Sequence, residues 1–142
     1  MPVKVELDRF LDAQKNTYSH ALSEIQNGKK TSHWMWFIFP QIAGLGFSET
    51  SRFYAIRDLE EATVYLAHPI LGKRLVEITS VLLAKQDKSA HEIFGSPDDM
   101  KLLSCMTLFS QVKNALAVFN DVIEKYFEGR KDVKTLELIN SL

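Results

Sequence analysis

The sequence has a single cysteine, few prolines and no long apolar run. With Cys105 alone, a disulfide within the chain and a zinc site built on thiolates are both excluded. Its apolar neighbours Leu102, Leu103 and Met106 favour a buried structural thiol over a nucleophile. The longest purely apolar run covers residues 34–40, far short of the roughly 20 residues that a membrane-spanning helix needs. We therefore predict no membrane partner, and a reducing cytoplasm suits the lone thiol.

Neither positive nor negative charge dominates the sequence. The 17 Lys and Arg residues nearly balance the 18 Asp and Glu residues, so the formal net charge is −1. Proteins whose main partner is a nucleic acid usually carry a clear positive charge, so we expect no nucleic-acid partner. A hydrophobic share of 46% and a charged share of 25% are typical of a globular protein. Because 142 residues have room for one domain, we predict a single domain over residues 1–142.

Short helices, each with its own start and stop signals, are predicted along the whole chain. Apolar residues spaced by three, four and seven indicate a first helix over residues 7–27, which Asn27 and Gly28 end. Asn114 is expected to cap a later helix that turns Leu116 inward. Other helix starts are predicted at Ser32, Ser48 or Thr50, Asp58, Pro69, Ser89, Ser96 and Asp132. The expected fold is all-α, a single compact domain of about seven or eight mostly short helices and not a simple four-helix bundle.

Residues 28–57 form the most specialised segment of the sequence. The run 33–39 fits a short buried helix that Pro40 ends, although its aromatic residues also suit a strand. Four large rings come first, from Trp34, Trp36, Phe37 and Phe39. A loop with Gly44 and Gly46 follows, and polar side chains stand around it: Gln41, Ser48, Ser51, Arg52 and Tyr54. Such a combination is typical of a small-molecule pocket. A tightly packed core element followed by a tight loop explains it as well, and both interpretations stay open.

His33 is the best acid–base candidate among the four histidines, because an imidazole changes its charge near neutral pH. The structural alternative is a histidine at a helix start, bonded to a backbone carbonyl. Asp98, Lys101 and Ser104 recur every three residues and share one face of a predicted helix. If that face points inward, Asp98 would meet His33, and Lys101 would bind an anion together with Arg52. If it points outward, it is an ordinary solvated face.

The sequence has no local motif for a metal or a cofactor. No two histidines are three to five residues apart, the spacing of a zinc-binding pair on a helix. The loop from Gly44 to Gly46 matches neither the P-loop nor the dinucleotide fingerprint. We therefore predict neither a metal site nor a cofactor.

Six motifs occur together along the chain: GKKTSHWMWFIFPQ at residues 28–41, GLGFS at 44–48, SRFYAI at 51–56, HPILGKRL at 68–75, IFGSPDDMKL at 93–102 and TLF at 107–109. In this combination the sequence resembles the DUF1810 family of uncharacterised bacterial proteins over nearly its whole length, with Cys105 where a small residue is expected. The resemblance implies a small, mainly helical, cytoplasmic bacterial protein, and it implies no reaction. It favours a pocket over a mere core, since packing alone rarely requires His, Gln, Ser, Tyr and Lys beside the rings.

Two hypotheses for the function follow. The first is a metal-independent hydrolase of a nucleotide-like or heterocyclic ligand, with His33 and Asp98 as catalytic residues. The ligand-binding residues would be Trp34, Trp36, Gln41, Ser48, Ser51, Arg52, Tyr54 and Lys101. The alternative is a non-catalytic accessory module that binds a metabolite or a peptide. The first hypothesis requires His33, Gln41, Tyr54 and Lys101 to converge on one open cavity. A small-molecule ligand is the partner expected, and the oligomeric state stays open.

Overall fold

Side-chain caps start four of the helices in the computed structural model, which describes residues 6–141. Ser48, Asp58, Ser89 and Asp132 each accept a hydrogen bond from the backbone N–H three residues later. Ser89 and Glu92 form a complete capping box. The described residues contain ten helices and no strand: α1 (Asp8–Gln14), α2 (Tyr18–Gln26), α3 (Met35–Ile38), α4 (Glu49–Phe53), α5 (Leu59–Ala67), α6 (Leu71–Ala84), α7 (Ala90–Phe94), α8 (Asp98–Ser110), α9 (Val118–Phe127) and α10 (Val133–Asn140).

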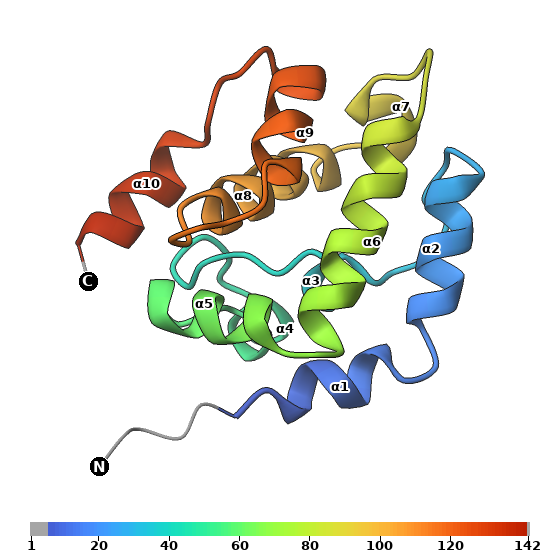
Figure 1. The fold of residues 1–142 in the computed structure, drawn as a ribbon. Helices are drawn as coiled ribbons and strands as arrows, with labels where there is room; N and C mark the ends of the chain where they lie inside the picture. Colours follow the sequence, from blue (N-terminus) through green and yellow to red (C-terminus); the bar gives the residue numbers. More distant parts are fainter. Residues whose placement is uncertain (1–5, 142) are drawn as a thin grey trace.

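Helix α8 passes through the middle of the core, where every residue from 102 to 109 is buried. Helices α5, α7, α9 and α10 pack against it, and α6 packs against α2, α5 and α9. In Figure 1, α6 lies between α2 on one side and α9 and α10 on the other. The apolar stripe of α6, formed by Leu71, Leu75, Ile78 and Leu82, is buried in this core. The described residues therefore share one hydrophobic core, as a single domain does.

The all-α prediction is confirmed, but the chain has more helices than the expected seven or eight. The helix predicted over residues 7–27 is two helices, which meet at a bend without glycine or proline. Helix α1 packs against α3, whereas α2 packs against α6. The bend lets each helix face its own partner, and this tertiary requirement leaves no local signal in the sequence.

The aromatic segment forms the short helix α3, as predicted, although the helix starts after Trp34 rather than after Ser32. Beyond Pro40 the chain makes a loop that contains α4 and returns to its own start. Ile56 donates its backbone N–H to the carbonyl of Gln41, and Ala43 donates to the carbonyl of Ile56, both at 2.8 Å. This single parallel bridge closes residues 42–56 into one unit beside α3.

Helix α10 packs against this loop. Gly44 has a φ of +105°, and a Cβ there would lie 3.0 Å from the side chain of Leu138 on α10. Asp132, the cap of α10, accepts a hydrogen bond from the Ser104 hydroxyl at 3.1 Å and donates its N–H to the Thr107 hydroxyl at 3.0 Å. The start of α10 is thereby fixed to α8, and the loop packs against α10.

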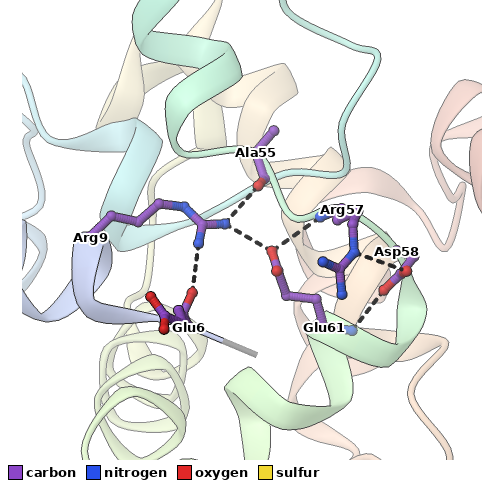
Figure 2. Close-up of polar contacts among 6 residues, drawn as sticks. All are labelled: Glu6, Arg9, Ala55, Arg57, Asp58 and Glu61. Atoms are coloured by element: carbon purple, nitrogen blue, oxygen red, sulfur yellow. Dashed lines mark hydrogen bonds and ion pairs between the residues drawn. The ribbon is translucent and has the colours of Figure 1, made fainter. Parts of the chain in front are cut away.

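A partly buried ion pair fixes the other end of the loop (Figure 2). The guanidinium of Arg9 donates to the carbonyl of Ala55 at 2.9 Å and to the carboxylate of Glu61 at 2.8 Å. The same carboxylate oxygen accepts the backbone N–H of Arg57 at 3.1 Å, and the side chain of Asp58 caps the helix that carries it. Helix α1, the last residues of the loop and α5 are joined by these bonds.

Two further expectations have clear outcomes. Cys105 is fully buried, as predicted, and burial raises the pKa of its thiol. The helix start at Asn114 is wrong, because α9 begins after Ala117, and Leu116 is 57% exposed. Asn114 has a φ of +63° and belongs to a turn between α8 and α9.

Within residues 6–141, no helix combines the length and apolar character needed to cross a bilayer.

Candidate functional site

A hollow of about 110 Å³ lies between α3, the loop 41–46, α4 and the start of α8. We call it the first hollow. Its floor is apolar, with Met35, Ile42 and Ala43 among the lining residues. Six residues that the sequence predicts to bind a ligand also line it: Trp36, Gln41, Ser51, Arg52, Tyr54 and Lys101. Lys101 brings the start of α8, which is distant in the sequence, to the same hollow as α3 and the loop.

A second hollow of about 300 Å³ adjoins the first and shares Met35, Trp36 and Lys101 with it. The second hollow is lined in addition by polar residues and a proline: Lys30, His33, Ser96, Pro97 and Asp98. The expected convergence of His33, Gln41, Tyr54 and Lys101 on one cavity is therefore not met, because His33 lines only the second hollow. Gln41, Tyr54 and Lys101 share the first hollow, while His33 lies across the Trp36 wall with Asp98 and Lys101.

Two residues with predicted ligand contacts lie outside both hollows. Trp34 is fully buried in the core, where its indole N–H donates to Glu24 at 2.9 Å. The hydroxyl of Ser48 caps α4 and donates to the Ser51 hydroxyl at 2.8 Å. The Ser48 hydroxyl thus contacts a residue that lines the first hollow, whereas Trp34 belongs to the core.

The polar groups of the aromatic residues separate into two classes. Most have protein partners: the N–H of Trp34 and the hydroxyls of Tyr18, Tyr65 and Tyr126. In the part of the chain that the structure describes, the N–H of Trp36 and the hydroxyl of Tyr54 have none, and the same holds for the side-chain amide of Gln41. All three unpaired groups belong to residues that line the first hollow.

In the second hollow, one carboxylate lies between two ammonium groups. Asp98 contacts the Nζ atom of Lys30 at 2.8 Å and that of Lys101 at 3.4 Å. Lys30 lies over the Trp34 ring and Lys101 over the Trp36 ring, at 5.1 and 5.4 Å from the ring centroids. His33 is exposed, and among residues 6–141 its imidazole has no hydrogen-bond partner. His33 and Asp98 therefore face the same hollow without bonding to each other.

Two residues that matter for this geometry had weak or no sequence signals. Lys30 appears in the sequence as one of two adjacent lysines, and nothing there predicts a side chain only 8% exposed. Glu24 accepts four hydrogen bonds, from Thr31, Ser32 (two) and Trp34. It lies on α2, and only the turn after that helix brings its carboxylate to the segment 31–34. Residues 6–141 contain no group of three or more His, Cys, Asp or Glu side chains placed to hold a metal ion.

Comparisons with known proteins agree with this fold. The family model described as "Protein of unknown function (DUF1810)" matches residues 4–139. The chain is similar to the crystal structure of the conserved hypothetical protein Rv1873 from Mycobacterium tuberculosis, with 44% sequence identity and a TM-score of 0.94. That match covers 96% of this chain and 97% of the other. The comparison with curated proteins finds no match.

Proposed function

The chain belongs to the DUF1810 family, and from the geometry of its first hollow we propose that it binds a small molecule with a flat six-membered ring. The observation that carries this proposal is the set of unpaired polar groups on Trp36, Tyr54 and Gln41 around one hollow. These three side chains are half-buried, so water satisfies their polar groups in the free protein, and the polar edge of a ligand would replace that water. A ligand would satisfy them together.

The size of the first hollow limits the ligand. An apolar protein cavity of about 150 Å³ admits a benzene ring, and the first hollow has about 110 Å³ with an open side. One six-membered ring fits with its edge toward the opening, and a fused ring system would extend beyond it. Trp36 offers a ring face for stacking, and the unpaired N–H, hydroxyl and amide groups would bind the heteroatoms of a heterocycle.

The shape of the first hollow depends on Gly46. A Cβ at this position would lie 2.5 Å from the Cβ of Ser51, so the loop can approach α4 this closely only with glycine. Ser51 and Arg52 are thereby held at the border of the hollow. These residues would contact the ligand at its open edge, where the guanidinium can bind an acceptor or an anion.

Hydrolysis is the second candidate function, and one observation favours it. His33 and Asp98 line the second hollow, which shares Trp36 and Lys101 with the first. A ligand whose ring occupies the first hollow would place its substituent near His33. There the imidazole would take a proton from an attacking water molecule and return it to the leaving group, without a metal. Asp98 lines the same hollow and would take part in this proton transfer with His33.

Thermal denaturation in the presence of single-ring heterocycles tests the binding proposal. Uracil, cytosine, nicotinamide and their nucleosides are suitable probes, and a true ligand at 100 times its Kd stabilises the fold by about 2.7 kcal/mol. Tyr54→Phe should leave the unliganded Tm unchanged and weaken binding about tenfold, because it removes one ligand hydrogen bond. Tyr18→Phe, which removes a hydroxyl outside both hollows, is the matched control. A flat response to every ring compound would overturn the proposal.

Turnover is tested separately on any probe that binds. We expect His33→Asn and Asp98→Asn to abolish release of base or phosphate while ligand binding persists. His20→Asn, at an exposed position on α2, should behave as the wild-type protein. If wild-type protein binds the probes and releases no product, the protein is a binding module and the hydrolase hypothesis is wrong.

A further inference from the structure

The charges around the two hollows differ from those of the whole chain. The chain carries a formal net charge of −1, but its hollows are lined by three cationic side chains, Lys30, Arg52 and Lys101, against one carboxylate, Asp98. Positive charge gathered on the walls of a concave site attracts anionic ligands. We propose that the ligand of the first hollow carries an anionic group on its substituent, and that Lys101 binds this group where the two hollows meet. This inference rests on the proposed ring-binding function.

Lys101 is the side chain available for an anion, because Lys30 is already committed to Asp98. The Lys30 ammonium is 2.8 Å from Asp98, which is the distance of a charge-assisted hydrogen bond, and the Lys30 side chain is only 8% exposed. The Lys101 ammonium is 3.4 Å from the other carboxylate oxygen, beyond normal hydrogen-bond length, and its side chain is 29% exposed. Lys30 therefore compensates the Asp98 charge, and Lys101 can move to a ligand without leaving that carboxylate unpaired.

The position of Lys101 joins the ring site to the anion site. Its ammonium lies 5.4 Å from the centroid of the Trp36 ring, the wall that both hollows share. A ligand ring packed against Trp36 in the first hollow would therefore carry its substituent past this ammonium into the second hollow. There the exposed imidazole of His33 offers a further donor to the same anion.

The volumes of the two hollows indicate the class of ligand. The first, about 110 Å³, accommodates one ring, and the second, about 300 Å³, accommodates a sugar with a phosphate. Together they reach the lower part of the range of roughly 300–1,000 Å³ found for ligand pockets. A pyrimidine nucleoside monophosphate has the required single ring, spacer and negative charge, and we assign the site to this class.

Calorimetric titration with uridine and uridine 5′-monophosphate tests the inference. The wild-type protein should bind the monophosphate at least about tenfold more tightly than the nucleoside, as a charge-assisted hydrogen bond predicts. Raising the salt concentration should reduce this preference and leave uridine binding unchanged. Lys101→Met keeps the apolar stem over Trp36 and should abolish the preference, whereas Lys101→Arg should retain it. Lys113→Met, at an exposed position away from both hollows, is the control.

Each outcome has a distinct meaning. Uridine binding by Lys101→Met shows that the variant is folded and that the ring site is intact. If uridine binds and the monophosphate binds no more tightly, the anion site is overturned while the ring-binding function stands. Equal preference in wild type and Lys101→Met also overturns the assignment to Lys101. If neither uridine compound binds, this inference fails, and the screen of ring compounds decides the proposed function independently.

Discussion

The indole N–H of Trp34 donates a hydrogen bond to the carboxylate of Glu24 at 2.9 Å. The same carboxylate accepts three more bonds, from the N–H of Thr31 and from the N–H and hydroxyl of Ser32. Glu24 thus holds residues 31–34, the segment that precedes α3 and carries His33. Partial burial opposes ionisation of Glu24, but the four donors outweigh it and lower its pKa from 4.5 to about 2.

Because of this lowered pKa, the free energy of unfolding depends on pH in the acid range. Because the folded pKa lies below the unfolded one, Glu24 stabilises the fold fully above pH 4.5, and this contribution disappears as the pH falls from 4.5 to 2. Glu24→Gln should destabilise the protein by about 1 kcal/mol at pH 7, a value reduced for the solvent that reaches this side chain. The variant should also lose less stability than wild type between pH 7 and pH 3, as urea unfolding at both values would measure. Glu137→Gln, an exposed substitution, should keep the wild-type pH dependence.

Helix caps account for most of what the sequence predicts correctly about the fold. Each correct cap accepts a hydrogen bond from the backbone N–H three residues later, as Asp58, Ser89 and Asp132 do. Such a signal is local, because the cap and its partner are close together in the sequence. The bend between α1 and α2 lacks such a signal, because it depends on which helix each one packs against. The helix start predicted at Asn114 is wrong because a residue that can cap a helix also tolerates a positive φ.

Six of the eight predicted ligand-binding residues line the first hollow, but Trp34 and Ser48 do not, and the sequence does not predict how the residues are arranged. Trp34 and Trp36 are two positions apart with similar surroundings in the sequence, yet one is sealed in the core and the other forms a wall of both hollows. The Trp34 ring packs against Phe39 and Phe94, and Glu24 on α2 accepts its N–H. Likewise, Tyr54 lines the first hollow and His33 the second. Which hollow each residue lines depends on how the closed loop packs, and the hydrophobic periodicity of the sequence does not predict this packing.

Cys105 should be unreactive in the folded protein. Its side chain is fully buried, and burial raises the pKa of the thiol, so the reactive thiolate is not formed near neutral pH. With a chromogenic disulfide reagent at pH 8, we expect no labelling of native protein over minutes and one thiol per chain in 8 M urea, an order-of-magnitude contrast in rate. Rapid labelling of one thiol in native buffer would show that α8 opens or that the residue is accessible.

Gly72 on α6 permits the close approach of α5. A Cβ at this position would lie 1.9 Å from the carbonyl oxygen of Leu66, and backbone atoms cannot move aside as a flexible side chain can. In an ordinary helix, alanine is more stable than glycine by about 1 kcal/mol. Here Gly72→Ala should instead destabilise the protein by about 3 kcal/mol, since overpacking shifts the backbone. Chemical denaturation measures this change, and Ser80→Ala, exposed on the same helix, should stay within about 0.5 kcal/mol of wild type.

The ion pair between Arg9 and Glu61 should show strong coupling in a double-mutant cycle. Arg9→Met leaves the Glu61 carboxylate, with a side chain only 6% exposed, without its cation and should cost about 3 kcal/mol. Adding Glu61→Gln to that variant removes the uncompensated charge but keeps an acceptor for the N–H of Arg57. The double variant should therefore be more stable than Arg9→Met by at least about 1 kcal/mol, although Glu61→Gln alone destabilises wild type. Additive free energies of unfolding would mean that the pair contributes nothing beyond its separate contacts.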